Sequence, residues 1–268
     1  MIFYYAAGGG LGHLTRGRRV LETLGLEATI VTTSPHARDA RIAGRFPTIE
    51  VPPQLEHDVA AHRDWIARLD PERLIVDTFP GGIQGELCGL DVPMDLVVRL
   101  LRWDEYRRAV PDVLPSFETA WVLEELEREH DEWVHANSNR VLPLALECKI
   151  TEPGLTLSSE SFWLIVHSGP EDEVRELIAY ASELLVIENE RPEKILVATQ
   201  CRVQLPSGFE AIDVYPAATM FARATRIISA AGFNVMLESN SHQDKHVVVP
   251  FPRRFDDQFR RAARRRTR

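Results

Sequence analysis

His13 is the residue of this sequence best placed for acid–base chemistry. It ends the stretch Gly8-Gly9-Gly10-Leu11-Gly12-His13, directly after the apolar residues 1–7. An imidazole with an ordinary pKa of about 6.5 can remove a hydroxyl proton near neutral pH. A carboxylate normally orients such a base, and the sequence offers Asp77 and Asp104 as alternatives for that role. The structural alternative is a histidine near a helix start that only bonds a backbone carbonyl.

The glycines before His13 predict an anion-binding turn. Glycine lets the backbone turn sharply and lets a ligand approach closely. We expect a helix to begin near Thr15, and the N–H groups of its first turn would point at the ligand. A strand, a glycine-rich turn and a helix start therefore indicate a site for a charged group close to His13.

A second turn follows the apolar residues 73–77. It reads Asp77-Thr-Phe-Pro-Gly-Gly82 and stands at the carboxyl end of a predicted strand. Parallel sheets bind ligands at that end, so this turn is a second candidate for the site. An ordinary loop between a strand and a helix is the alternative.

Length, charge and cysteine content narrow the class of protein. The 268 residues suit two modest domains. The net charge of −9 argues against a general nucleic-acid binder. The three cysteines form no CxxC pair, which disfavours a disulfide framework or a zinc site and fits a reducing cytoplasm. Neither a membrane-spanning run nor a basic segment typical of a signal peptide is expected.

The apolar pattern predicts an α/β protein in which strands alternate with helices. Predicted strands of the first half are 2–6, 28–32, 48–51, 73–77 and 95–101, with helices at 15–24, 59–69, after Gly82 to Cys88, and within 121–134. Predicted strands of the second half are 162–166, 194–198, 210–214, 226–229 and 246–249, with helices at 172–184, 235–239 and 257–265. Such alternation favours right-handed crossovers and parallel sheets.

The same pattern divides the chain into two Rossmann-like domains that face one cleft. The stretch 142–154 contains two prolines and a glycine, and its apolar pattern is weak. We therefore predict an N-terminal, acceptor-side domain over 1–146 and a C-terminal, nucleotide-sugar-binding domain over 147–268.

Two motifs resemble those of a known family. The first is the glycine stretch that ends at His13. The second runs Ser229-Ala-Ala-Gly-Phe-Asn-Val-Met-Leu-Glu238, followed by Val249-Pro-Phe251 and Asp257-Gln258. Together they resemble GT-B glycosyltransferases, in particular those related to the lipid-linked N-acetylglucosaminyltransferase of peptidoglycan synthesis.

The resemblance implies a role for each matching residue. His13 would be the general base, and Glu238 would accept hydrogen bonds from the ribose hydroxyls of a nucleotide-sugar. The remaining implied residues would contact phosphate, acceptor or donor sugar: Gly9, Gly10 and Gly12 in the first domain, and Ser168, Gly169, Gly232, Phe233, Asn234, Asp257 and Gln258 in the second. The donor would be linked to UDP or dTDP, and the family usually needs no metal or other cofactor.

The sequence also departs from the family pattern. Glu171, Asp172 and Glu173 follow the Ser168-Gly169 turn, where three carboxylates would repel a diphosphate. The C-terminal helix that crosses back to the first domain in the family is expected to be short or absent. The basic residues 260–268 predict a solvated helix face, with attraction to an anionic membrane surface or lipid phosphate as the alternative.

The resemblance implies metal-independent transfer of a hexose or N-acetylhexosamine from a nucleotide-sugar to an unknown hydroxyl acceptor. A sugar-nucleotide epimerase of the same architecture is one alternative. It would need further carboxylates as acid and base. A non-catalytic protein that binds nucleotide-sugars is the other, and the acidic residues 171–173 favour it.

Overall fold

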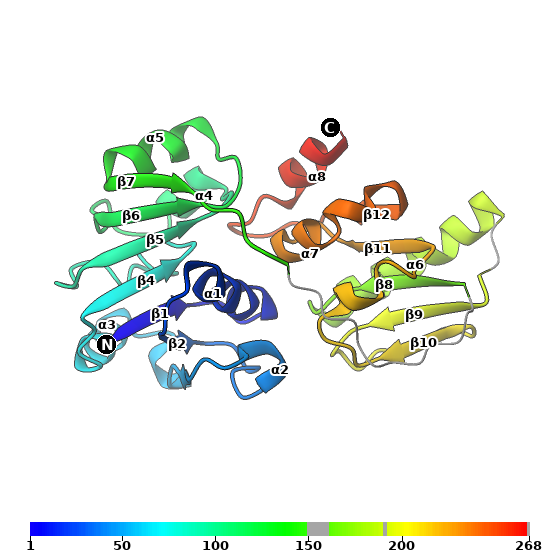
Figure 1. Ribbon diagram of the computed structural model, residues 1–268, viewed down its shortest axis with the longest axis horizontal. Coiled ribbons are helices and arrows are strands. Elements are labelled where there is room, and N and C mark those ends of the chain that lie inside the picture. The colour runs from blue at the N-terminus through cyan, green and yellow to red at the C-terminus, as the bar shows by residue number, and fades with distance from the viewer. Residues whose placement is uncertain (149–160, 190–191, 267–268) are drawn as a thin grey trace. The chain divides into compact units, whose positions relative to one another are not determined.

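The computed structural model describes residues 1–148, 161–189 and 192–266, which form two compact units (Figure 1). Unit 1 comprises Met1–Glu147 and Arg253–Asp257, and unit 2 comprises Cys148–Pro252 and Gln258–Arg268. The predicted boundary after residue 146 differs by one residue from this division. A larger difference from the prediction is that Arg253–Asp257, expected in the second domain, belong to unit 1. Part of the predicted linker, 149–154, lies outside the described residues.

Unit 1 is built on a parallel sheet of seven strands in the order β3-β2-β1-β4-β5-β6-β7. The strands are β1 (Ile2–Ala6), β2 (Thr29–Thr32), β3 (Thr48–Glu50), β4 (Arg73–Asp77), β5 (Met94–Val98), β6 (Phe117–Val122) and β7 (Ser138–Pro143). The chain moves outward from β1 to β3, then returns to β4 on the other side of β1. This reversal between β1 and β4 is the place where open parallel sheets bind ligands.

Helices connect these strands. They are α1 (Leu11–Leu24), α2 (Ala40–Ala43), the 3-10 turn η1 (Pro53–Leu55), α3 (Val59–Arg68), α4 (Trp103–Arg107) and α5 (Arg128–Ala136). Helix α1 lies directly on β1, because a Cβ atom at Gly17 would come within 2.7 Å of the Tyr4 ring. This close packing fixes the first turn of α1 above the carboxyl end of β1.

Unit 2 has a parallel sheet of five strands in the order β10-β9-β8-β11-β12. The strands are β8 (Phe162–Val166), β9 (Lys194–Ala198), β10 (Phe209–Ile212), β11 (Arg226–Ala230) and β12 (His246–Val249). Its helical segments are α6 (Glu171–Glu188), η2 (Ala217–Met220), α7 (Phe233–Glu238), η3 (Asn240–Lys245) and α8 (Gln258–Arg266). The strand order again reverses next to the first strand, between β8 and β11.

Three predicted helical segments need correction. Helix α1 begins at Leu11, not near Thr15. The helix predicted within 121–134 begins at Arg128, because Trp121 belongs to β6. No helix follows Gly82, where the stretch to Cys88 forms turns.

The turn after β4 has a clear physical cause. Gly82 and Gly85 adopt φ angles of +82° and +95°, which disfavour residues with a side chain and are incompatible with an α-helix. The buried hydroxyl of Tyr106 accepts a hydrogen bond from the Gly81 N–H and donates one to the Gly82 carbonyl, each at 2.8 Å. A tertiary contact therefore determines this segment.

The returning segment Arg253–Asp257 is integrated into unit 1. The Arg102 N–H donates a 2.7 Å hydrogen bond to the Phe255 carbonyl, and Leu101 forms an antiparallel bridge with Asp256. The Phe255 ring packs edge-on against Tyr106, with ring centroids 5.5 Å apart. The return to unit 1 is thus a short extended segment, while α8 belongs to unit 2.

None of the helices in the described part of the chain combines the length and apolar character that a bilayer crossing requires.

Candidate active site

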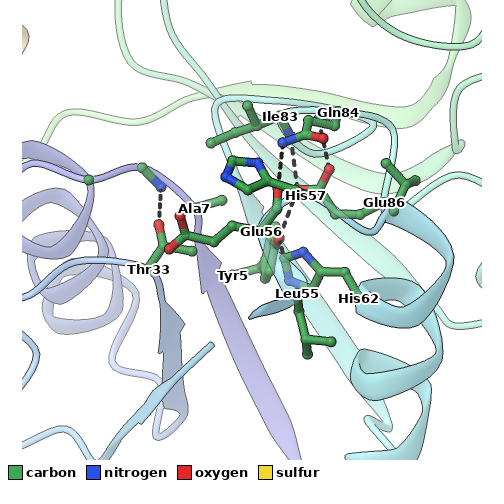
Figure 2. A pocket seen from close by; sticks show the side chains of 13 residues that line it. Tyr5, Ala7, Thr33, Leu55, Glu56, His57, His62, Ile83, Gln84 and Glu86 are labelled. Atoms are coloured by element: carbon green, nitrogen blue, oxygen red, sulfur yellow. Dashed lines mark hydrogen bonds between the residues drawn. The ribbon is translucent and has the colours of Figure 1, made fainter. Parts of the chain in front are cut away.

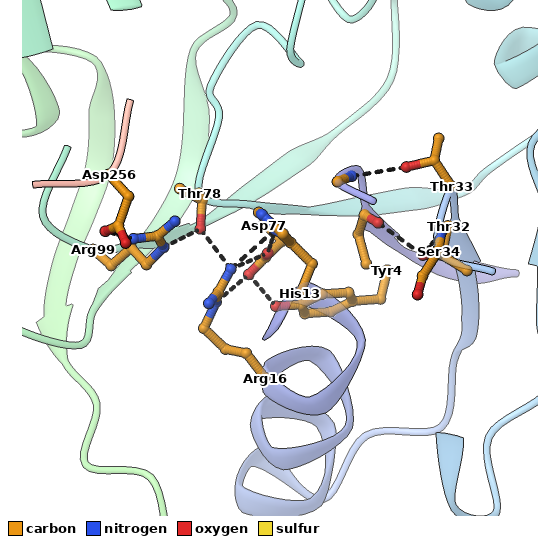
Figure 3. A network of polar contacts seen from close by, with 12 residues as sticks. Tyr4, His13, Arg16, Thr32, Thr33, Ser34, Asp77, Thr78, Arg99 and Asp256 are labelled. Atoms are coloured by element: carbon orange, nitrogen blue, oxygen red, sulfur yellow. Dashed lines mark hydrogen bonds and ion pairs between the residues drawn. The ribbon is translucent and has the colours of Figure 1, made fainter. Parts of the chain in front are cut away.

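His13 and Asp77 meet at the reversal point of the unit 1 sheet (Figure 3). His13 lies in the first turn of α1, directly after β1, and Asp77 is the last residue of the neighbouring strand β4. The His13 Nδ1 atom lies 2.5 Å from Asp77 Oδ2. Asp77 therefore takes the orienting position for which Asp104 was the alternative. Asp104 lies in the first turn of α4.

The contact with Asp77 assigns the proton on the His13 ring. An ionised carboxylate only accepts hydrogen bonds, so Nδ1 carries the proton and Nε2 keeps its lone pair. Burial lowers the pKa of His13, although Asp77 partly opposes this effect. The His13 side chain remains 14% exposed. A neutral imidazole whose Nε2 keeps its lone pair is the form that a general base requires.

Arg16 binds the Asp77 carboxylate at both oxygens. Its Nε atom lies 2.7 Å from Oδ1 and its Nη2 atom 2.5 Å from Oδ2. The buried Tyr4 hydroxyl adds a 2.8 Å hydrogen bond to Oδ1. Burial alone would raise the pKa of Asp77, but Arg16 and His13 outweigh it and hold that pKa well below its usual range. Asp77 therefore stays ionised and fixed in orientation.

A chain of polar contacts extends from Asp77 to the returning segment (Figure 3). The Thr78 hydroxyl accepts hydrogen bonds from Arg16 Nη2 at 2.9 Å and from Arg99 Nε at 3.2 Å. Arg99 in turn forms an ion pair with Asp256. Thr78 has a φ angle of +71°, which is rare and strained for a β-branched residue. Such strain persists only where the surroundings fix the backbone, as these contacts do here.

Sequence reasoning missed most of this network. Arg16 is three residues after His13, which places both side chains on one face of α1, so helical spacing could have indicated it. Arg99 and Asp256 are far apart in the chain, and no local pattern connects them.

Gly8 also positions His13, although no role was predicted for it. A Cβ atom at Gly8 would lie 2.4 Å from His13 Cδ2 and 2.7 Å from Nε2. Gly8 has a φ angle of +142°, and its N–H donates a 2.8 Å hydrogen bond to Thr33 Oγ1. The imidazole therefore lies against the bare Gly8 backbone on one side, while the Phe79 ring has its centroid 5.5 Å from that of the imidazole.

The three glycines predicted to admit ligands differ in their surroundings. A Cβ atom at Gly9 would meet no atom within 4 Å, and one at Gly10 only a backbone nitrogen at 4.0 Å. Gly10 precedes α1 and provides no side-chain cap. Gly12 is the second residue of α1. The backbone around Gly9 and Gly10 thus leaves room for a neighbouring group, and contact with a ligand there stays a prediction.

A cavity of about 210 Å³ lies beside this loop in unit 1 (Figure 2). It is bordered by the end of β1, the loop before α3 and the turn after β4. The residues that line it are Tyr5, Ala7, Gly8, Gly9, Thr33, Leu55, Glu56, His57, Val59, His62, Ile83, Gln84 and Glu86. Gly8 lines the cavity and also lies against the His13 ring, so this glycine separates the cavity from the candidate base.

In unit 2, the predicted phosphate turn follows β8. Ser168 is exposed, and a Cβ atom at Gly169 would lie 2.4 Å from His167 Nε2. The same His167 nitrogen lies 2.7 Å from Glu173 Oε2. The following carboxylates are also engaged: Glu171 pairs with Arg175, and Asp172 Oδ1 accepts the Glu173 N–H at 3.0 Å. The three carboxylates expected to repel a diphosphate thus already have partners.

The second predicted group in unit 2 follows β11. Gly232 caps α7, Phe233 and Asn234 form its first turn, and Glu238 is its last residue, half-buried. A Cβ atom at Gly232 would meet only Val235 Cγ1, at an ordinary 3.9 Å. Packing within the described chain therefore does not explain a glycine at position 232.

Asp257 and Gln258 fall on opposite sides of the division between the two units. Gln258 is buried and its Oε1 atom accepts the Phe251 N–H at 3.0 Å. Its side-chain oxygen thus ties the start of α8 to the residues after β12. Asp257 is half-buried and follows Asp256, the partner of Arg99.

The basic C-terminal residues have a structural function that neither of our two interpretations included. Arg261 Nη1 donates to the Ala231 carbonyl at 2.9 Å. Arg265 Nη1 donates to the Met236 carbonyl at 3.1 Å, and its Nη2 to the Ser239 carbonyl at 2.9 Å. Both arginines therefore bind carbonyls at the two ends of α7, where a cation at the C-terminal end is favourable. Residues 267–268 lie outside the described part of the chain.

No group of three or more His, Cys, Asp or Glu residues within 1–148, 161–189 and 192–266 is arranged to hold a metal ion. Metal independence stays a prediction.

Comparison with known proteins gives matches at the level of structure. No protein-family model matches the chain, and no curated protein sequence does. The glycotransferase of kitacinnamycin has a TM-score of 0.59 at 15% identity, covering 99% of this chain and 84% of its own. The spinosyn rhamnosyltransferase SpnG, in complex with spinosyn aglycone, has a TM-score of 0.61 at 13% identity, covering 99% and 84%.

A plant enzyme has the same architecture. UGT2 of Phytolacca americana, in complex with UDP-2-fluoro-glucose and pterostilbene, has a TM-score of 0.57 at 14% identity, covering 98% of this chain and 82% of its own. Identities this low establish the fold alone. The chain therefore has the α/β fold of the GT-B glycosyltransferases, with two Rossmann-like units.

Proposed function

We propose that the protein is a glycosyltransferase that moves a hexose or N-acetylhexosamine from a nucleotide-sugar to an acceptor hydroxyl. The observation that carries the proposal is the His13–Asp77 pair at the reversal point of the unit 1 sheet. It leaves a neutral imidazole nitrogen at the edge of an open glycine loop. The fold supports the proposal, because the similar solved structures are named as glycosyltransferases.

The proposed reaction is a direct displacement. The acceptor hydroxyl loses its proton to His13 Nε2 as its oxygen attacks the anomeric carbon of the donor. The bond between that carbon and the phosphate oxygen breaks, and the nucleoside diphosphate leaves with the electron pair. Asp77 stabilises the resulting imidazolium, since its carboxylate is ionised and hydrogen-bonded to Nδ1.

For the donor, we propose the residues of unit 2 that the resemblance implied. Glu238 would bind the ribose hydroxyls, while Gly232, Phe233, Asn234, Ser168 and Gly169 would lie near the diphosphate. Asp257 and Gln258 would face the donor sugar. Complexes of similar structures with thymidine diphosphate and with UDP-2-fluoro-glucose support a dTDP- or UDP-linked donor. The relationship to the lipid-linked N-acetylglucosaminyltransferase stays a proposal, as does peripheral contact with an anionic membrane.

Calorimetric titration with UDP and dTDP tests the donor site first. Turnover of UDP-glucose and dTDP-glucose is then measured with a panel of hydroxyl compounds, with and without excess chelator. We expect nucleoside diphosphate release only when an acceptor is present, unaffected by chelator. Release of free, epimerised sugar without acceptor would identify the epimerase instead. Nucleotide binding without turnover would identify the non-catalytic alternative, and activity restored by magnesium or manganese after chelation would contradict the metal-free mechanism.

A further inference from the structure

Three buried, hydrogen-bonded residues lie side by side in the wall of the cavity beside Gly8 (Figure 2). The Tyr5 hydroxyl donates to Glu86 Oε1 at 2.8 Å, and His62 Nε2 lies 3.2 Å from the same hydroxyl. Tyr5 comes from β1, His62 from α3 and Glu86 from the turn after β4. None of the three belongs to the set around Asp77.

The hydrogen-bond pattern assigns the protons of this set. The Tyr5 hydroxyl gives its only proton to the Glu86 carboxylate, so it accepts from His62 Nε2–H. The neutral His62 ring then keeps the lone pair of Nδ1 as an acceptor. Burial lowers the pKa of His62, which favours this neutral form. His62 therefore lines the cavity as a neutral ring without positive charge.

Glu86 accepts three hydrogen bonds at the wall of the cavity. Its Oε1 accepts the Ile83 N–H at 2.9 Å and its Oε2 accepts the Gln84 N–H at 2.8 Å. Three donors, counting the Tyr5 hydroxyl, stabilise the ionised carboxylate, and one lone pair of Oε2 is left for a further donor. At the rim, Glu56 is exposed and adds a second carboxylate.

The charges of the cavity select against anions. Among the described residues that line it there are two glutamates and neither a lysine nor an arginine. A phosphate in such a site would meet two carboxylates and no cationic side chain among the described lining residues, so the open backbone of Gly9 would have to outweigh both carboxylates. A hydroxyl or ammonium group, by contrast, would donate to Glu86 or Glu56.

We infer that this cavity binds a hydroxyl-rich ring of the acceptor that carries no negative charge, that an ammonium substituent strengthens the binding, and that phosphate-bearing acceptors are rejected. The inference rests on the proposed function for its location next to His13. A volume of about 210 Å³ is below the roughly 300–1,000 Å³ of pockets for whole drug-sized ligands. The cavity thus fits one ring of a larger acceptor.

Three hexoses of different charge test the inference without any nucleotide. The native protein is titrated with glucose, glucosamine and glucose 6-phosphate, and the imidazole resonances of His57 and His62 are followed by NMR. We expect glucosamine to shift the His62 signals at the lowest concentration, glucose at a higher one, and glucose 6-phosphate not at all. Binding of glucose 6-phosphate as tight as that of glucosamine, or no response to any hexose, would overturn the inference.

A variant that reverses the charge of Glu56 at the rim of the cavity tests the role of charge. Glu56→Lys alters an exposed side chain, so folding is not at risk, and the similarly exposed Glu132→Gln on α5 is the control. We expect Glu56→Lys to weaken glucosamine binding about two- to fivefold, the size of one screened surface charge, and to admit glucose 6-phosphate. Equal effects of both variants would contradict the role of charge. Nucleotide binding is measured separately, so failure here leaves the proposed function testable.

Discussion

Arg16 donates hydrogen bonds to both carboxylate oxygens of Asp77, and one of these oxygens, Oδ2, also binds His13 Nδ1. Arg16 Nη2 and His13 Nδ1 both donate to Asp77 Oδ2, and this shared acceptor brings the two nitrogens to 3.0 Å from each other. Because both nitrogens carry protons, this approach is a packing contact and not a hydrogen bond. The arginine neutralises Asp77, so His13 does not need to be charged in order to balance it. In the proposed reaction, His13 would therefore take up the acceptor's proton from its neutral state.

His13→Ala should lower turnover by about 10²–10⁴-fold, the usual contribution of a positioned acid or base. Nucleoside diphosphate affinity should remain close to that of the native protein, because the proposed nucleotide residues lie in unit 2. Steady-state kinetics with UDP-glucose or dTDP-glucose and calorimetry measure the two effects. His135→Ala, an exposed histidine on α5, is the control. Normal turnover of His13→Ala would show that His13 is structural.

Arg16→Gln should shift the acidic limb of the pH–rate profile to higher pH. Arg16 lowers the pKa of His13 through its charge, so its removal raises that pKa and His13 takes up its proton at higher pH. Breaking a buried ion pair also costs about 3–5 kcal/mol of unfolding free energy. NMR titration of His13 gives the pKa directly. Arg18→Gln, which removes an exposed pair with Glu22, should change neither quantity appreciably.

Gly8→Ala should displace the His13 ring, because the new Cβ would lie 2.4 Å from Cδ2 at a φ angle of +142°. We expect lower thermal stability and a changed His13 imidazole spectrum. Gly9→Ala is the matched comparison, since its Cβ would meet no atom within 4 Å and should leave both readouts unchanged. Equal effects of the two variants would contradict a specific role of Gly8.

Stability should fall as the pH drops from about 6.5 toward 3, since His130 is buried and neutral in the folded state. Burial lowers its pKa to about 3, so the unfolded chain binds one more proton across this range. The loss per histidine is at most about 1.4 kcal/mol for each pH unit. His246, with a pKa also lowered to about 3, acts in the same direction in unit 2.

His130→Phe isolates the contribution of unit 1. Within the described residues neither His130 ring nitrogen has a hydrogen-bond partner, and the ring stacks on Trp103 with centroids 4.3 Å apart, so phenylalanine can keep the stack. Urea unfolding at pH 7 and pH 4 should show a smaller pH dependence for the variant. An unchanged dependence would mean that other groups cause the loss.

Glu238→Ala should weaken UDP or dTDP binding by about 1–3 kcal/mol, the range for losing hydrogen bonds to a charged group. Calorimetric titration measures the change. Glu210→Ala on β10 removes an exposed glutamate from the same unit and should have no effect. Unchanged affinity of the Glu238 variant would remove this residue from the donor site.

Many of the strands could be predicted from local patterns, but β6 and β7 were not predicted, and Trp121 of β6 was assigned to a helix. Strands such as 2–6, 73–77 and 162–166 have the predicted bounds because their buried positions are continuous apolar runs. Asp77 was identified because it ends such a strand, and His13 because it ends the glycine-rich stretch that follows another. What local patterns could not give was the choice between Asp77 and Asp104, which depends on the order of strands in the sheet.

Contacts between distant residues account for the rest. The turn after β4 depends on the Tyr106 hydroxyl, 24 residues beyond Gly82. The Arg99–Asp256 pair joins residues that are 157 positions apart. Two arginines of α8 that were predicted to be solvated, Arg261 and Arg265, instead bind carbonyls of residues before and after α7. Only the packing of α8 on α7 reveals these contacts.

The Arg253–Asp257 segment also limits how early the folding of unit 1 can be completed during synthesis on the ribosome. Chains emerge N-terminus first and their domains tend to fold in that order. Unit 1, however, receives Phe255 and Asp256 only after residues 148–252 have been synthesised. The seven-stranded sheet can assemble early, but the Arg99–Asp256 pair cannot. The last side chains to join the network of the candidate base are thus supplied only after residues 148–252 have been synthesised.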